Sequence, residues 1–131
     1  MITLKVVCGI IWKDKKVFIA RRKPEKSFGG YWEFPGGKHE LNETYEKSLA
    51  RELYEELGMK VNVEKHFMSV FHKYDNFIIE LISYLCQFQE ASFIMSDHDK
   101  FEWIEIEDID QWNLSPADRD IAKELKAAYS K

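Results

Sequence analysis

Three glutamates in one short segment have the residue types and spacing best suited to catalysis. Glu52, Glu55 and Glu56 lie in a predicted helix, Thr44 to Leu57, and at about 100° per residue their carboxylates share one face. Like charges three or four residues apart on a helix repel, and acidic groups in its last turn oppose the helix dipole. A solvated acidic surface would carry this pattern too. A hard divalent cation such as Mg²⁺ would instead turn the repulsion into coordination.

The helix that presents these glutamates is bounded by clear signals. Thr44 is suited to cap its first turn, Gly58 is suited to the left-handed position after its end, and no proline interrupts it. The apolar residues predicted on its core-facing side are Leu49, Ala50, Leu53 and Leu57. The carboxylates are therefore expected to point away from the helix's contact with the core.

Strand-like runs flank this helix on both sides. The expected strands are 6–12, 17–20, 61–73, 77–88 and 101–106, a loop covers 21–37, and a closing helix over 117–129 has Ile121, Ala122, Leu125 and Ala128 on one face. This order predicts an α/β protein, with a mixed sheet and helices packed on its faces. A length of 131 residues predicts one domain, 1–131.

The residues around the glutamates follow a longer pattern. From Gly37, five residues precede Glu43, seven more precede Arg51, and the run 51–59 reads RELYEELGM. This spacing resembles the signature of the Nudix hydrolase family, G-x5-E-x7-R-E-U-x-E-E-x-G-U with U aliphatic, over residues 37–59. The segments that resemble its MutT-type branch are 9–11, 20–22, 32–38, 102–103 and 115–118. The resemblance implies the Nudix fold, an α/β/α sandwich with a central mixed β-sheet.

The resemblance also implies an activity: Mg²⁺-dependent hydrolysis of a nucleoside triphosphate to the monophosphate and pyrophosphate, which sanitises the nucleotide pool and thereby serves DNA repair. The metal ligands it implies are the Gly37 carbonyl, Glu52, Glu55, Glu56 and a distal glutamate, Glu102. Mn²⁺ is expected to substitute for Mg²⁺. Arg51 is implied to orient a glutamate of the motif, with Glu43 as an outer partner. The general base is left open between Glu52 and Glu102.

Four further residues are expected to bind substrate, and three of them match substrate-binding positions of the MutT-type branch. Arg22 corresponds to an arginine that reaches substrate phosphate, and Lys38 is suited to a second positive contact. Phe34 and Asp118 match positions that contact the nucleobase. Oxidised-guanine specialists typically have asparagine at the latter position, and an aspartate instead resembles cytidine-nucleotide pyrophosphohydrolases. The substrate therefore stays open between an oxidised purine such as 8-oxo-dGTP and CTP or dCTP.

Two other functions within the fold are considered: hydrolysis of another nucleoside diphosphate linked to X, and nucleotide binding without catalysis. Non-catalytic modules usually lose one of the carboxylates, whereas this motif is intact. The histidines, His39, His66, His72 and His98, lack ligand spacing and are not expected to bind metal.

Composition limits the partners and the location. A net charge of −4 argues against a nucleic-acid duplex as partner. No run reaches the roughly 18 apolar residues of a membrane span. Cys8 and Cys86 lie in apolar runs and are expected to be reduced core residues. We expect a cytoplasmic monomer or homodimer whose partner is a small nucleotide.

Overall fold

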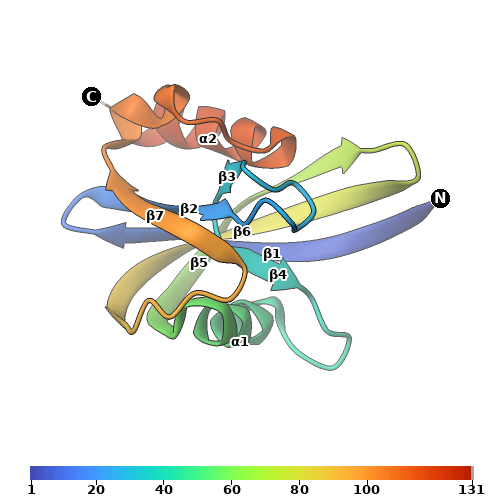
Figure 1. Ribbon diagram of the computed structural model, residues 1–131, viewed down its shortest axis with the longest axis horizontal. Coiled ribbons are helices and arrows are strands. Elements are labelled where there is room, and N and C mark those ends of the chain that lie inside the picture. The colour runs from blue at the N-terminus through green and yellow to red at the C-terminus, as the bar shows by residue number, and fades with distance from the viewer. Residues whose placement is uncertain (131) are drawn as a thin grey trace.

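A mixed β-sheet forms the centre of the structure, with one helix on each of its faces (Figure 1). The structure is a computed structural model that describes residues 1–130, so residue 131, the last of the predicted domain, lies outside the described residues. The elements are β1 (Ile2–Lys13), β2 (Lys16–Arg22), β3 (Trp32–Glu33), β4 (Gly36–Lys38), α1 (Tyr45–Leu57), β5 (Met59–Lys73), β6 (Phe77–Ala91), β7 (His98–Ile104), the 3-10 helix η1 (Ile106–Gln111) and α2 (Pro116–Tyr129).

The sheet combines parallel and antiparallel pairs. Its main path runs β3-β2-β1-β6-β5, with β4 also paired to β1 and β7 to β2. The long central pair, β1 with β6, is parallel, whereas the other strand pairs are antiparallel. The expected mixed sheet between helices is therefore confirmed.

Strands β1 and β2 separate soon after their shared turn. They pair only at Trp12 with Val17 and at Lys13 with Lys16. Farther along β1, residues 6–8 pair with β4 instead, and the Gly9 amide donates to the Pro35 carbonyl at 2.8 Å. The segment 32–38 is thereby held between the two diverging strands, and this opening contains the main cavity described below.

Each face of the sheet has its own apolar core. Alternate residues of β1 point to opposite faces, as in any strand, so Ile11 packs toward α1 and Ile10 packs toward α2. The α1-side core contains Leu49, Leu53 and Leu57 of α1, and the α2-side core contains Ile121, Ala122 and Leu125 of α2. The two helices thus lie on opposite faces of one sheet (Figure 1).

The expected elements are present, with four differences in detail. The region 21–37, expected as a loop, contains the short strand β3 and the start of β4. The last strand begins at His98 and ends at Ile104, and Ile106 starts a 3-10 helix, so the strand predicted over 101–106 was placed too late. Ala50 and Ala128, predicted on the buried helix faces, are exposed. A methyl group buries little apolar area, so alanine is a weak marker of the face that packs. None of the helices within residues 1–130 is long and apolar enough to span a membrane.

Candidate active site

The main cavity has a volume of about 560 Å³ and lies where β1 and β2 diverge, between the N-terminal part of α2 and the carboxylate side of α1. The residues predicted to be functional that line it are Arg22, Phe34, Gly37, Lys38, Glu52, Glu56 and Asp118. Glu55, Arg51 and Glu102 do not line it. Its size is that of a typical small-ligand site.

Helix α1 is fixed at both ends, which sets the direction of its glutamates. The Thr44 hydroxyl accepts the Lys47 amide at 3.1 Å, and Gly58 ends the helix with a left-handed φ of 58°. Leu53, which stands between Glu52 and Glu56 in the sequence, is fully buried against the sheet. This contact fixes the rotation of α1 about its own axis. As a result, Glu52 and Glu56 both reach the cavity, one helical turn apart.

The buried Glu56 and the half-buried Asp97 form an acidic pair in the main cavity. Burial raises the pKa of Glu56 far above its usual range, as do the hydrogen bond to Asp97 and the charges of Asp97, Glu33 and Glu52. Burial also opposes ionisation of Asp97, but the hydrogen bond from Glu56 and the charge of Lys26 outweigh it, so the pKa of Asp97 is lowered. The two carboxyl groups therefore share a proton, and the directions of their pKa shifts favour Glu56 as its donor and Asp97 as its acceptor. A divalent cation would replace that proton.

Arg51 connects the remaining carboxylates of the motif. Its Nε donates to both carboxylate oxygens of Glu43 at 3.0 and 3.1 Å. Its Nη1 lies 3.1 Å from Glu52 Oε1 and 3.2 Å from Glu55 Oε2. The Glu55 side chain is 57% exposed and points to the outer side of this group. Glu52 and Glu55 thus share one guanidinium, and the orienting role of Arg51 stays a prediction.

The backbone of β4 passes against Glu52. A Cβ added at Gly37 would overlap the Glu52 carboxylate, and one at Gly36 would overlap the backbone of Val7. The two glycines let the Gly37 backbone approach the carboxylate. A carbonyl oxygen there and carboxylate oxygens on the helix form an oxygen-only donor set, which suits Mg²⁺ or Mn²⁺.

The carboxylates are held by protein partners in this arrangement. Within residues 1–130, no three His, Cys, Asp or Glu side chains converge in a geometry that would already hold an ion. Glu52 is bound to Arg51, and Glu56 shares a proton with Asp97. The donor chemistry of the cavity is therefore compatible with Gly37, Glu52 and Glu56 as metal ligands, whereas Glu55 and Glu102, the other predicted ligands, do not line it.

Arg22 enters the cavity from the end of β2. Its Nε donates to the Ser27 carbonyl at 2.7 Å, and its Nη1 lies 3.5 Å from Glu33 Oε2. The buried His98 side chain contacts the same oxygen through Nε2 at 2.8 Å. His98 Nδ1 is buried without a hydrogen-bond partner among the described residues. Glu33 is thus held from two sides with its carboxylate in the cavity.

Asp118 lies in the cavity at the start of α2. Its Oδ1 accepts the Phe34 amide at 2.9 Å, and its Oδ2 accepts the Ser115 hydroxyl at 2.6 Å. Burial raises the pKa of Asp118 to about 7, assisted by the charge of Glu33 and opposed by these hydrogen bonds. Phe34 is 2% exposed and lines the cavity beside it. This end of the cavity combines an apolar wall with one directional polar group, which suits a nucleobase.

Lys38 and Glu102 lie apart from the centre of the cavity. Lys38 is exposed and lines the cavity at the end of β4. Glu102 shares its face of β7 with Ile104, which packs in the α2-side core, whereas Phe101 and Trp103 pack toward α1. Strand alternation therefore directs Glu102 away from the glutamates of α1, and the structure does not bring them together.

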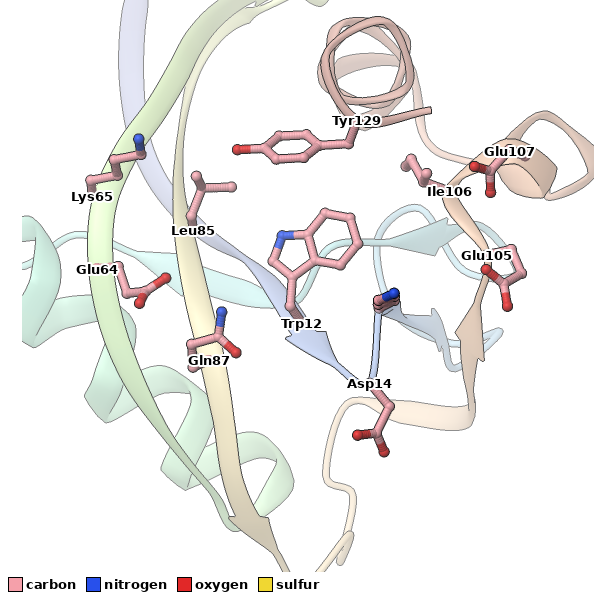
Figure 2. Close-up of a pocket in the computed structure, with 11 residues that line it drawn as sticks. Trp12, Asp14, Glu64, Lys65, Leu85, Gln87, Glu105, Ile106, Glu107 and Tyr129 are labelled. Atoms are coloured by element: carbon pink, nitrogen blue, oxygen red, sulfur yellow. The ribbon is translucent and has the colours of Figure 1, made fainter. Parts of the chain in front are cut away.

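A second cavity, of about 570 Å³, lies below the C-terminal end of α2 (Figure 2). Trp12 and Tyr129 form its aromatic part, with ring centres 5.4 Å apart. Figure 2 shows Glu64 and Lys65 on one side of these rings and Glu105 and Glu107 on the other, all of them exposed. None of the predicted site residues lines this cavity. It carries no arrangement of buried polar groups.

Asp97, Glu33 and His98 were not predicted as site residues. The sequence holds one signal for the first of them, an acidic residue directly before a strand that pairs beside β2. Loops that precede or follow sheet strands often carry functional groups. The pair of Glu56 with Asp97 depends on a contact between residues 41 positions apart, which no local pattern reveals.

Known proteins resemble this chain over most of its length. A NUDIX domain model matches residues 6–124. A CTP pyrophosphohydrolase of Escherichia coli is 33% identical over 115 residues, 88% of this chain and 85% of that protein. An 8-oxo-dGTP diphosphatase of Buchnera aphidicola is 31% identical over 121 residues, 92% of each chain.

Solved structures agree in fold. The solution structure of the E. coli ORF135 protein has a TM-score of 0.87 with 31% identity, and covers 99% of this chain and 93% of its own. The crystal structure of a MutT protein from Methanosarcina mazei has a TM-score of 0.88. Because the family model matches nearly the whole chain, and relatives more than 30% identical span most of it, this protein belongs to the NUDIX domain family.

Proposed function

We propose that this protein is a pyrophosphohydrolase that cleaves a nucleoside triphosphate to the monophosphate and pyrophosphate, and so removes unwanted nucleotides from the pool. The relatives named as a CTP pyrophosphohydrolase and as 8-oxo-dGTP diphosphatases support this reaction. The main cavity supports it independently, because one of its walls carries carboxylates and another carries a buried polar group beside an apolar surface.

Glu52 and Glu56, with the Gly37 carbonyl, are the proposed ligands of Mg²⁺ or Mn²⁺. When bound, such an ion holds phosphate oxygens and lowers the pKa of a coordinated water. Arg51 and Glu43 hold Glu52 in place, and Glu55 completes the acidic group from its outer side. Asp97 is a further candidate ligand, since it already accepts the proton of Glu56.

Glu52 is the favoured general base between the two candidates. It lines the cavity next to Gly37, whereas Glu102 lies on the α2 side of β7 and outside the cavity lining. A base must be within hydrogen-bond reach of the proton it takes. Arg22 and Lys38 are the proposed phosphate contacts, since they are the cations that line the same cavity as the carboxylates.

The single observation that carries the proposal is one cavity that joins Glu52 and Glu56 to Asp118. For the nucleobase, a cytosine is favoured by Asp118, because a carboxylate accepts from an exocyclic amine and its protonated form donates to a ring nitrogen. Oxidised guanine remains the second candidate, since it also carries an exocyclic amine and relatives act on 8-oxo-dGTP.

The test is a panel of CTP, dCTP, dGTP, 8-oxo-dGTP and a nucleoside diphosphate sugar, each with Mg²⁺ and with chelator. We expect pyrophosphate and monophosphate in equal amounts from one or more triphosphates, only with metal present. Binding without turnover for every compound would contradict the proposal and indicate a binding module. Cleavage of the diphosphate sugar alone would indicate the other hydrolase class.

Three expectations of the sequence accompany this proposal. We propose that residues 1–131 form one domain, which the two cores on a single shared sheet support. We further propose a small nucleotide as the only ligand class, with no nucleic-acid duplex or membrane as partner. A cytoplasmic monomer or homodimer is the proposed state.

A further inference from the structure

Ser48 is a buried hydroxyl on α1 that the proposed chemistry does not use. Its side chain is fully buried, one turn before Arg51 and Glu52. Three polar groups surround its Oγ: His39 Nδ1 at 2.9 Å, Glu43 Oε1 at 3.1 Å and the Glu40 amide at 3.4 Å. A buried polar group has at least one partner, and the three around Ser48 Oγ use the full hydrogen-bonding capacity of a hydroxyl, which holds these groups together.

The number of donors and acceptors fixes the direction of each bond. A hydroxyl donates once and accepts twice. Glu43 only accepts and already takes the Arg51 Nε, so the hydroxyl proton goes to Glu43. The two lone pairs then accept the Glu40 amide and His39, which must carry its proton on Nδ1. The His39 ring is held in this orientation against the Tyr45 ring, with centres 4.5 Å apart.

The bonds continue from Ser48 into the proposed metal ligands. Glu43 receives the Ser48 hydroxyl on Oε1 and the Arg51 Nε on both oxygens. Arg51 in turn contacts Glu52 and Glu55 through Nη1. Without the hydroxyl, Glu43 keeps only its bonds to Arg51, and the Glu43–Arg51 pair can pivot as one unit. The position of Glu52 would then be less well defined.

We infer that Ser48 and His39 are positioning residues that hold Glu52 in its metal-binding place through Glu43 and Arg51. The inference rests on the proposed metal role of Glu52. Removing a group that hydrogen-bonds a metal ligand without touching the metal typically lowers metal affinity by about 10- to 100-fold. Ser48 and His39 occupy variable positions of the motif, so their pairing is a property of this chain rather than of the spacing pattern.

The test measures Mn²⁺ binding to the full chain without nucleotide, by the electron paramagnetic resonance signal of free Mn²⁺. Ser48→Ala should weaken Mn²⁺ binding about 10-fold or more, and the Mg²⁺ concentration for half-maximal activity should rise in parallel. His39→Phe keeps the ring against Tyr45 and leaves Ser48 in place, so it should weaken binding in the same direction and provides the test if Ser48→Ala does not fold.

Two control variants separate positioning from loss of stability. Ser69→Ala removes a serine–histidine bond of the same 2.9 Å length, to His66 on β5 and outside the main cavity. Thr44→Ala removes the cap of α1 and destabilises that helix without touching Ser48 Oγ. Both should bind Mn²⁺ as the unaltered protein does.

The outcomes are distinct. Suppose that the unaltered protein binds Mn²⁺ and hydrolyses nucleotide. If the Mn²⁺ affinities of Ser48→Ala and His39→Phe are then within twofold of its affinity, the positioning role is wrong and the proposed function stands. Equal weakening in Thr44→Ala would likewise overturn the inference, because helix stability would then explain the effect. Absence of Mn²⁺ binding by the unaltered protein would overturn both.

Discussion

Replacing Asp118 with asparagine should make the protein's stability less dependent on pH. The folded state keeps the proton of Asp118 up to a pKa of about 7, whereas an unfolded aspartate loses it near pH 3.9. Between these values the folded protein binds more protons than the unfolded chain, so the free energy of unfolding falls as pH rises, by about 1.4 kcal/mol per unit. Over the whole window the loss is about 4 kcal/mol.

Asparagine preserves the local hydrogen bonds without a titratable group. Its Oδ1 can accept the Phe34 amide, and its amide nitrogen can donate to the Ser115 hydroxyl, which now acts as acceptor. The variant should therefore become more stable relative to the unaltered protein as pH rises from 5 to 7, by about 2 to 3 kcal/mol. Above pH 8 the difference should stay constant.

Urea unfolding of both proteins at half-unit steps from pH 5 to 8, followed by tryptophan fluorescence, measures this difference directly. Other acidic groups, including Glu56, titrate in both proteins and largely cancel in the comparison. Two stability curves that run parallel across this range would refute the reasoning, because Asp118 would then titrate alike in the folded and unfolded states. A difference that shrinks as pH rises would reverse the assigned sign.

Four further substitutions test the site and the core. Glu56→Gln should lower turnover by orders of magnitude, because a neutral amide is a poor metal ligand, with the fold retained by circular dichroism. Glu55→Gln should also lower turnover by orders of magnitude, and near-normal steady-state kinetics would count against its metal role. Arg22→Ala should raise KM for the triphosphate through loss of a phosphate contact, as initial rates over a substrate range would reveal. Leu53→Ala should cost about 2 to 5 kcal/mol in urea unfolding, since this side chain is fully buried.

The sequence predicted best what depends on local pattern. Helix α1 begins after Thr44 and ends before Gly58 as its capping residues indicated, because caps act within a few residues of the helix end. The strands around it followed from apolar runs between turn residues. Boundaries were less well predicted where a strand runs directly into a 3-10 helix, as at Ile104 and Ile106, because both residues are buried and apolar.

The site was predicted only in part, because its remaining groups meet through long-range contacts. Asp97 reaches Glu56 only after β7 pairs with β2, and Glu33 of β3 meets His98 of β7 because both strands pair with β2. Motif spacing describes one helix and the turn before it. It could not reveal that Glu102, next to a matching Trp103, faces the α2 side of the sheet.

The charge of the main cavity sets a strong condition on what it can bind. Glu33, Glu52, Glu56, Asp97 and Asp118 all line it, and its cations there are Arg22 and Lys38. A triphosphate brings several more negative charges, and like charges in a partly buried site repel strongly. Nucleotide binding should therefore depend on divalent cations before any catalytic step. Burial first, and then the neighbouring carboxylates, raises the pKa values of Glu56 and Asp118, and a bound divalent cation would offset the same excess of negative charge before a nucleotide enters.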